Sequence, residues 1–320
     1  MHFVFVIAVV FAFEAPSSHT QLESFAKIVH YILVMHNAFR FISIDVRLLS
    51  DHQTAMLVEI LKDLRDMWKQ GTPTFGPFVG LNAPGICEIL GHAGFDYCIV
   101  DLEHGAIDLE TAENMVRGAN AAGIAPIIRV ALNREGLISQ ALDLGAAGVH
   151  VPTISTAEEA QEAVWAAKFS PLGRRGVDPA VRAARYSADR GIFFEKANRE
   201  TLVVTAIEGT EGIKNLPEIL QVKGIDVLFV GPYDLSQSLG VIGQVRHPKV
   251  IEKIQEIVTL SKKSGVAVGL YTDTPEIARE WVKQGILYCC LGIDSAILYN
   301  ASKDLVKQVH SETTTEQPKT

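Results

Sequence analysis

The sequence lacks the basic segments that are typical of proteins that bind nucleic acid or anionic membranes. No run rich in lysine or arginine occurs in the 320 residues, and the formal net charge is -8 with a pI near 5.7. Such a composition provides no field that would attract polyanions. We therefore expect no nucleic-acid or membrane partner, and a small molecule as the substrate.

Cysteine pairs at metal-ligand or redox spacing are also missing. The four cysteines form no C-x-x-C motif, and Cys289 and Cys290 are adjacent within an apolar run. Buried cysteines in such runs behave as small apolar residues. We expect reduced core thiols, alongside Cys87 and Cys98, in a cytoplasmic protein.

The two ends of the chain carry no motif that indicates function. Residues 1–13 are strongly apolar but lack a basic leader and are too short to span a bilayer as a helix. We expect residues 1–55 to be an appendage of unknown status and residues 56–307 to form one catalytic domain. Residues 308–320 are polar and are expected to be a disordered tail.

Eight short apolar runs follow residue 70 and predict eight β-strands. They are residues 76–81, 96–102, 125–130, 147–152, 202–208, 226–231, 266–271 and 287–293. Amphipathic segments separate most of them: 107–122, 134–144, 156–167, 213–222, 248–264 and 274–284. Continuous apolar strands that alternate with helices indicate a parallel sheet with both faces covered.

The strand count favours a closed α/β barrel of the TIM (β/α)8 type. An open doubly wound sheet would also alternate strands and helices, but no G-x-G-x-x-G motif follows the first strand. Apolar residues at helical spacing from Met56 to Trp68 predict a helix across the barrel floor. Glycines before several strands, as at Gly94, Gly123 and Gly145, predict left-handed helix ends.

One connection, residues 153–199, is unusually long. It contains the basic turn 173–176 (GRRG), followed by Arg182, Arg185 and Arg190. Long irregular segments in compact domains are commonly functional. This segment is expected to contact an anionic substrate or a neighbouring subunit, or to form surface ion pairs.

Polar residues gather where predicted strands end, which is where a barrel carries its chemistry. They are Asp101, Glu103, His104, Arg129, Glu208 and Asp234. Each alone has an ordinary explanation, such as a helix cap or a core histidine. Together they offer two hard oxygen ligands for a divalent cation, a proton carrier and an anion stabiliser. His150 has no motif partner, and we expect it to pack in the core.

The motifs resemble those of the HpcH/HpaI aldolases, the pyruvate-dependent class II aldolases of the phosphoenolpyruvate/pyruvate-binding barrel superfamily. The resemblance covers residues 71–307 and is carried by residues 99–105 (IVDLEHG), 128–130 (IRV), 142–146 (LDLGA), 151–152 (VP), 173–176 (GRRG), 207–208 (IE) and 231–236 (GPYDLS). It implies reversible cleavage of a 4-hydroxy-2-oxo acid to pyruvate and an aldehyde. It also implies a homo-oligomer, a trimer of dimers, in which a C-terminal helix is exchanged between subunits.

The resemblance also implies roles for individual residues. Glu208 and Asp234 match the ligands of a divalent cation, with Mg2+ or Mn2+ expected and Co2+ as a further candidate. Arg129 matches the arginine that faces the keto oxygen, and His104 matches the histidine of the proton-transfer step. Asp101 and Asp143 match the acids that orient this histidine, one of them across a subunit interface. Residues 231–234, which are Gly231, Pro232, Tyr233 and Asp234, match the segment where pyruvate rests.

Two further absences bear on the reaction. No lysine is found at a predicted strand end, which argues for a metal route over a Schiff base. Ala206 stands where some relatives have glutamine, which leaves the substrate preference open. A lyase for CoA thioesters of the malyl- or citryl-CoA type, and a barrel that only binds ligands, are the alternative hypotheses.

Overall fold

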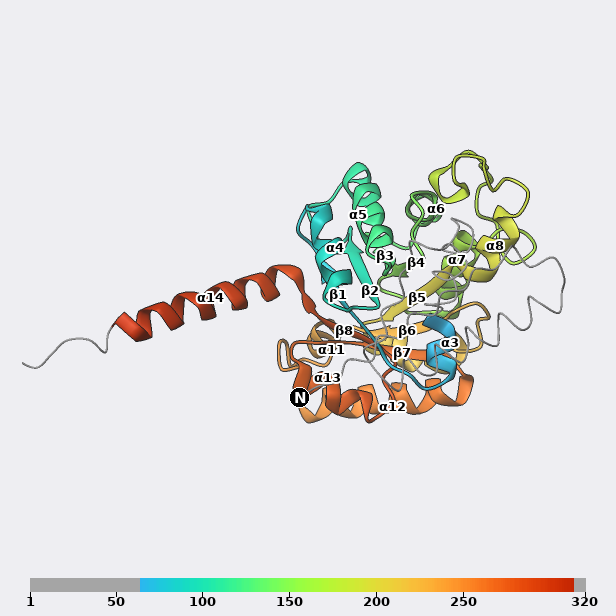
Figure 1. Ribbon diagram of the computed structural model, residues 1–320. Coiled ribbons are helices and arrows are strands. Elements are labelled where there is room, and N and C mark those ends of the chain that lie inside the picture. Colours follow the sequence, from blue (N-terminus) through green and yellow to red (C-terminus); the bar gives the residue numbers. More distant parts are fainter. Residues whose placement is uncertain (1–63, 314–320) are drawn as a thin grey trace, which may run out of the picture. The chain divides into compact units, whose positions relative to one another are not determined.

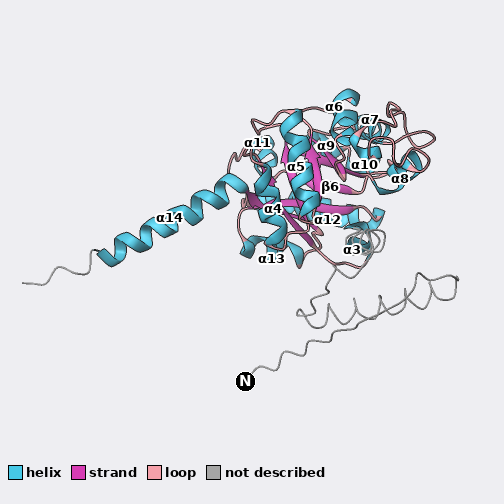
Figure 2. Cartoon of the chain, turned by 45° about the horizontal axis from the view of Figure 1, so that its top comes forward, coloured by secondary structure: helices cyan, strands magenta, loops and turns pink. Residues whose placement is uncertain are grey.

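The computed structural model describes residues 64–313 (Figures 1 and 2). Its elements, in chain order, are α3 (Leu64–Lys69), β1 (Thr74–Val79), α4 (Pro84–His92), β2 (Tyr97–Asp101), α5 (Leu109–Ala121), β3 (Ala125–Arg129), α6 (Glu135–Asp143), β4 (Gly148–Val151), α7 (Ala157–Ala167), η2 (Arg182–Ala184), α8 (Phe193–Glu200), β5 (Leu202–Ile207), α9 (Thr210–Lys214), α10 (Leu216–Ile219), β6 (Val227–Val230), α11 (Pro232–Ser238), α12 (Pro248–Ser264), β7 (Ala267–Thr272), α13 (Pro275–Val282), β8 (Tyr288–Ile293) and α14 (Asp294–Thr313).

The strands form a closed parallel barrel in sequential order, β1 to β8, which confirms the predicted α/β barrel. All eight predicted strands are present. β1 ends at Val79, two residues earlier than expected, because the next two backbone N–H groups donate to the carboxylate of Asp294 instead of continuing the ladder (3.0 Å each). That carboxylate joins the end of the first strand to the start of α14, just after the last strand.

Side chains alternate between the barrel interior and the helix-facing layer, as expected for strands. Tyr97 and Tyr288 stack in the interior with ring centroids 4.2 Å apart. Below them lies Trp68 of α3, whose ring is 5.8 Å from that of Tyr288 and whose Nε1 donates to Thr74 Oγ1 (2.9 Å). The described end of the predicted floor helix therefore closes the barrel at the strand N-termini.

The helices follow the sequence pattern with one clear difference. Gly94, Gly123 and Gly145 have φ of +95°, +70° and +87°, which confirms their role as left-handed helix ends. The single helix expected at residues 213–222 is instead two short helices, α9 and α10, that meet at Asn215. Pro217 lacks a backbone N–H, so it fits only the first turn of a helix and breaks the expected one.

The long connection between β4 and β5 extends mainly from the end of α7. Because helices run antiparallel to the strands, this extension lies at the strand N-termini, opposite the predicted site. Phe169, Ala184 and Phe193 form a small core there, and Arg175 lies 4.7 Å from the Phe169 ring centroid. Within this chain the part of the segment that follows α7 therefore does not reach the strand C-termini.

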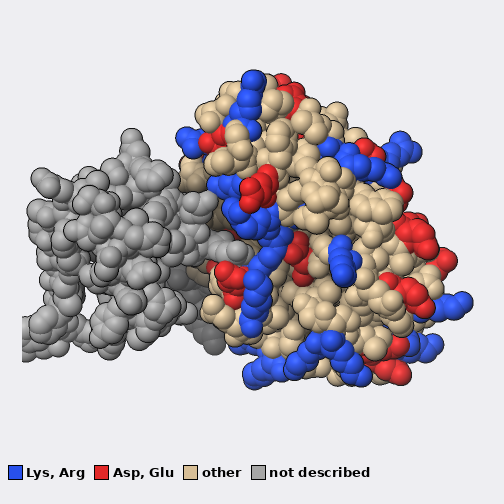
Figure 3. Space-filling model, turned by 90° about the vertical axis from the view of Figure 1, so that its right-hand side faces the viewer, with Lys and Arg blue, Asp and Glu red and all other residues tan. Residues whose placement is uncertain are grey.

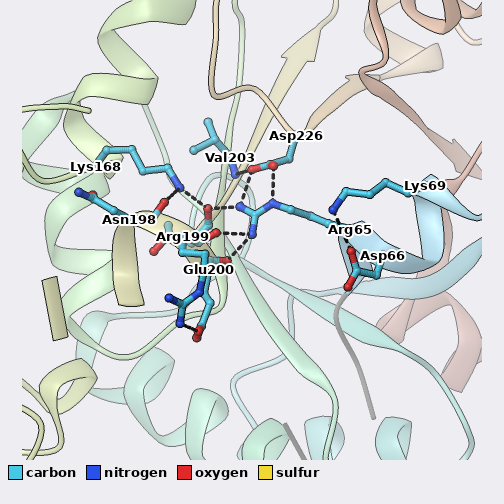
Figure 4. Close-up of polar contacts among 10 residues, drawn as sticks. Arg65, Asp66, Lys69, Lys168, Asn198, Arg199, Glu200, Val203 and Asp226 are labelled. Atoms are coloured by element: carbon cyan, nitrogen blue, oxygen red, sulfur yellow. Dashed lines mark hydrogen bonds and ion pairs between the residues drawn. The ribbon is translucent and has the colours of Figure 1, made fainter. Parts of the chain in front are cut away.

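A polar network fixes that extension to the barrel floor (Figure 4). Arg65 of α3 pairs with Asp226 and donates to the carbonyl oxygens of Arg199 (2.8 Å) and Glu200 (3.0 Å). Lys168 Nζ donates to the carbonyl oxygens of Asn198 and Thr201. Burial lowers the pKa of Lys168 to about 8. The network holds α3, α8 and the start of β6 together.

The C-terminal part of the described chain differs from the expected tail. α14 continues to Thr313, so residues 308–313 are helical and only residues 314–320 of the predicted tail lie outside the described residues. Polar composition alone does not prevent a helix, and this segment continues a helix that begins at Asp294. Residues 297–310 are all exposed. The predicted appendage, residues 1–55, also lies outside the described residues.

The four cysteines are free and buried, as expected.

Figure 3 shows acidic and basic side chains beside one another on one face of the described part. Within residues 64–313, no helix combines the length and apolarity needed to cross a bilayer.

Candidate active site

An arginine and an aspartate meet at the C-terminal ends of β2 and β3. Arg129 and Asp101 are direct neighbours in the parallel register. Their contact is bidentate, with Arg129 Nε and Nη2 at 2.9 and 2.7 Å from the two oxygens of Asp101. Burial opposes ionisation of Asp101, but the hydrogen bonds and charge of Arg129 outweigh it and lower the pKa of Asp101. The guanidinium also lies 4.3 Å from the Phe78 ring centroid, so both its edge and its face are fixed.

Glu103 and His104 extend this cluster toward solvent. Arg129 Nη1 lies 3.0 Å from Glu103 Oε2, and burial raises the pKa of Glu103 although Arg129 opposes that rise. The His104 side chain is 71% exposed, and its Nε2 is 4.0 Å from Glu103 Oε2. Asp101 accepts from the backbone N–H of His104 (3.2 Å), not from its ring. Asp101 therefore orients Arg129, and among the described residues Glu103 is the acid that lies beside the imidazole.

Glu208 and Asp234 converge over Gly231. A Cβ on Gly231 would lie 3.3 Å from Asp234 Oδ2, 3.3 Å from Glu208 Cγ and 3.5 Å from Glu208 Oε1. Glycine therefore leaves the space in which the two carboxylates approach each other. Burial, and after it the charges of Glu103 and Asp234, raise the pKa of Glu208 to about 7.

A strained turn supports Glu208 from β4. Thr153, just after β4, donates its backbone N–H to Glu208 Oε2 (3.1 Å) and has φ of +55°. This left-handed conformation is uncommon for a β-branched residue and is typical of functional loops whose surroundings enforce it. The sequence gives no sign of this contact, because the two residues are far apart in the chain.

The donor set suits a hard divalent cation. Among the described residues, no group of three or more His, Cys, Asp or Glu side chains is arranged to hold an ion. Two carboxylates that share a space, and whose mutual repulsion raises the pKa of one, are nevertheless a favourable place for positive charge. The remaining coordination positions would be open to water or substrate oxygens.

Asp143 does not join the other predicted residues within this chain. It is the last residue of α6, so it lies toward the strand N-termini, and its Oδ1 accepts from Nη2 of the buried Arg175 (2.6 Å). The motif that singled it out gives no information on the end of the barrel at which it lies. Any contact between Asp143 and His104 would have to come from another subunit.

The contact between Tyr233 and Asp273, near the strand ends, was not expected from the sequence. The Tyr233 hydroxyl donates to both oxygens of Asp273 (3.1 and 3.2 Å).

His150, in β4, is fully buried between the rings of Phe78 and Phe229, as expected for a core residue. Neither of its ring nitrogens has a hydrogen-bond partner among the described residues. Burial, and then the charge of Arg129, lower the pKa of His150 to about 3, so the ring is neutral at physiological pH.

The chain is similar to known proteins of one family. A family model described as HpcH/HpaI aldolase/citrate lyase matches residues 74–301. The 4-hydroxy-2-oxo-heptane-1,7-dioate aldolase of Escherichia coli is 34% identical over 251 residues, which are 78% of this chain and 95% of that protein. A 2-dehydro-3,6-dideoxy-6-sulfogluconate aldolase of Pseudomonas putida is 34% identical over 240 residues, 75% of this chain and 94% of that protein. A crystal structure of an HpcH/HpaI aldolase/citrate lyase family protein from Burkholderia cenocepacia superposes with a TM-score of 0.74 at 31% identity and covers 77% of this chain and 98% of that one.

Proposed function

Because the chain belongs to the HpcH/HpaI aldolase/citrate lyase family, we propose that it is a divalent-metal-dependent aldolase that reversibly cleaves a 4-hydroxy-2-oxo acid to pyruvate and an aldehyde. The observation that carries this proposal is the approach of Glu208 and Asp234 over Gly231, on the same end of the barrel as the fixed guanidinium of Arg129. Cleavage between C3 and C4 leaves negative charge on the pyruvate fragment. The site must stabilise that charge.

Glu208 and Asp234 would hold the cation, with Mg2+ or Mn2+ proposed and Co2+ as a further candidate. A bound divalent cation supplies Lewis-acid stabilisation of the enolate charge. Asp234 lies in the first turn of α11, where the leading backbone N–H groups have no intrahelical acceptor. The backbone N–H groups of Gly231, Tyr233 and Asp234 are the proposed donors to the pyruvate carboxylate, since Pro232 has none.

Arg129 has donors left for the substrate. A guanidinium carries five N–H bonds; two of them donate to Asp101, and Nη1 forms an ion pair with Glu103 at 3.0 Å. Because the bidentate pair and the ring of Phe78 fix its plane, the remaining donors need no reorganisation when charge develops on the keto oxygen. Asp101 is thus a positioning residue for Arg129 in this proposal.

His104 is the proposed proton carrier for the C4 hydroxyl. Its exposed ring is free to reach substrate directly or through a water, and Glu103 lies beside it. Asp143 would assist from a neighbouring subunit, since it lies at the other end of the barrel within its own chain. The exposed α14, with Leu298, Tyr299 and Leu305 among its uncovered apolar residues, supports a proposed homo-oligomer, a trimer of dimers with exchanged C-terminal helices.

The cytoplasm is the proposed compartment, because the four described cysteines are buried free thiols.

Exchange of the pyruvate methyl protons with deuterium tests the proposal without knowledge of the aldehyde. We expect NMR to show exchange with Mn2+, loss of exchange with EDTA, and loss in Asp234→Asn. Glu256→Gln, which removes an exposed carboxylate on α12, is the matched control and should exchange like the parent protein. Absence of exchange by the folded, Mn2+-loaded protein would refute the aldolase, and exchange that survives EDTA would refute the role of the metal.

A further inference from the structure

The hydrogen-bonded pair of Tyr233 and Asp273 has no role in the chemistry proposed above. Tyr233 belongs to α11, which follows β6, and Asp273 follows β7. Their contact therefore joins two neighbouring loops beyond the strand C-termini. Tyr233 is 45% exposed and Asp273 is exposed, so the pair is accessible to a ligand at this end of the barrel.

The strand registers place this pair beside the proposed metal site, at the same end of the barrel. The pairings of β5 with β6 and of β6 with β7 put Glu208, Gly231 and Tyr271 at one level. Tyr271 faces the barrel interior, where its ring lies 6.2 Å from that of Phe78 and 6.0 Å from that of Tyr233. Asp273 directly follows β7, and its carboxylate accepts from the hydroxyl of Tyr233. This carboxylate thus lies beyond the end of β7, on the β7 side of the opening.

The proposed reaction directs the aldehyde half toward this side. Arg129, Glu208 and Asp234 engage the pyruvate half from β3, β5 and β6, and His104 acts on C4 from the loop after β2. Of the remaining strands, β4 is followed by Thr153, which is engaged with Glu208, and β7, β8 and β1 form one continuous arc of the opening. This arc is the side of the opening that the proposed reaction leaves to the aldehyde half.

Among the described residues, the segments that follow these three strands carry negative charge and neither lysine nor arginine. The residues that directly follow the three strands, 273–274, 294–295 and 80–83, contain two aspartates and neither lysine nor arginine. Asp294 is occupied by the backbone N–H groups of the loop after β1. Asp273 is held by a neutral phenol, which leaves its charge uncompensated. A carboxylate or sulfonate at the far end of the aldehyde would be repelled by the negative charge of Asp273.

Two other arginines, Arg134 and Arg246, do not neutralise the charge of Asp273. Arg134 follows β3, which lies across the closed barrel from β7. Arg246 lines a cavity with Asp273, but its Nη2 pairs with Glu280 Oε2 at 3.1 Å. The uncompensated group on the β7 side is thus an anion.

We infer that Asp273, held in place by Tyr233, selects substrates whose aldehyde half is uncharged and carries hydroxyl groups. A fixed carboxylate repels a second anion and accepts hydrogen bonds from hydroxyls. The inference rests on the proposed aldolase function. An uncharged aldehyde half would distinguish the substrate of this chain from those of the two relatives described above, whose names specify a dioate and a sulfogluconate.

The test measures kcat/KM for aldol addition of pyruvate, with Mn2+, to aldehyde pairs matched in chain length. We expect a preference for butanal over succinic semialdehyde, and for glyceraldehyde over propanal. Asp273→Asn keeps a hydrogen-bonding group beside Tyr233 but removes the charge, so the butanal preference should fall roughly 3- to 10-fold, as expected for one charge across partly solvated space. Tyr233→Phe keeps the charge but removes the hydrogen bond that holds Asp273, so the preference for butanal should fall less than in Asp273→Asn, whereas Glu256→Gln should leave it unchanged.

Ratios of kcat/KM separate selection from a structural effect, because a general loss of folding lowers the rates with both aldehydes alike. Equal kcat/KM for butanal and succinic semialdehyde in the parent protein, or an unchanged ratio in Asp273→Asn, would overturn the inference. Pyruvate deuterium exchange needs no aldehyde. Its failure counts against the aldolase itself, whereas intact exchange with no discrimination by charge refutes only the role of Asp273.

Discussion

Replacement of His150 by leucine should remove a specific part of the acid sensitivity of this protein. The ring is fully buried beside Phe229, with centroids 4.6 Å apart, and neither nitrogen has a partner among the described residues. Leucine has a similar volume and no polar atom. At pH 7 we expect a free energy of unfolding about 0 to 2 kcal/mol higher in the variant, because relief of two unsatisfied nitrogens outweighs the lost ring contacts.

The difference should grow as the pH falls. The pKa of His150 is about 3 in the folded protein, against an ordinary value of 6.5, so the unfolded chain binds a proton between these limits and the folded protein does not. Stability carried by the neutral ring is complete above pH 6.5 and is lost on acidification at about 1.4 kcal/mol per pH unit. Between pH 7 and pH 4.5 the parent protein should lose about 2.5 kcal/mol more than the leucine variant.

Urea denaturation at pH 7.0, 5.5 and 4.5, at one fixed protein concentration, measures this difference. The other acidic groups titrate equally in the parent and the variant, so their contributions cancel in the difference between the two free energies of unfolding. His92→Leu removes an exposed histidine and should leave the pH dependence of the parent protein unchanged. If the stabilities of the parent and His150→Leu fall in parallel from pH 7.0 to 4.5, the buried neutral imidazole is refuted.

Three further substitutions address the floor and the site. Arg65→Ala should lower the free energy of unfolding by about 2–4 kcal/mol, because Asp226 loses the partner of a largely buried pair. Lys69→Ala, at an exposed pair, should change the free energy of unfolding by less than about 0.5 kcal/mol. Equal effects of the two substitutions in urea titrations would contradict this assignment. Gly231→Ala should weaken Mn2+ binding about tenfold in calorimetry, since its Cβ would crowd both carboxylates, and unchanged affinity would show that the space is not used. Arg129→Lys should slow pyruvate deuterium exchange about 100-fold while Mn2+ still binds, and a loss of less than threefold would remove Arg129 from the chemistry.

The barrel could be predicted from sequence because buried parallel strands are continuous apolar runs, and eight such runs alternate with helices. The same logic brought Asp101, Arg129, Glu208 and Asp234 to strand ends that the structure places at one end of the barrel. These residues are visible because each follows an apolar run directly.

Other features depend on contacts that no local pattern encodes. Asp273 meets Tyr233 across 40 residues of sequence, and Thr153 reaches Glu208 through a backbone N–H, which carries no residue identity. Asp143 was singled out by a motif, but only the direction of α6 shows that it lies at the other end of the barrel. The helical end of α14 was missed because a polar sequence is compatible with both a helix and a disordered tail.

The floor network of Arg65 and Asp226 has a consequence for how this chain can change over evolutionary time. It fixes the strand N-termini, whereas the residues that would meet the aldehyde lie on loops at the other end. Substitutions at positions such as Asp273 or Tyr233 therefore leave the main anchors of the fold intact. The substrate range can drift, by single substitutions, on a scaffold whose stability is maintained elsewhere.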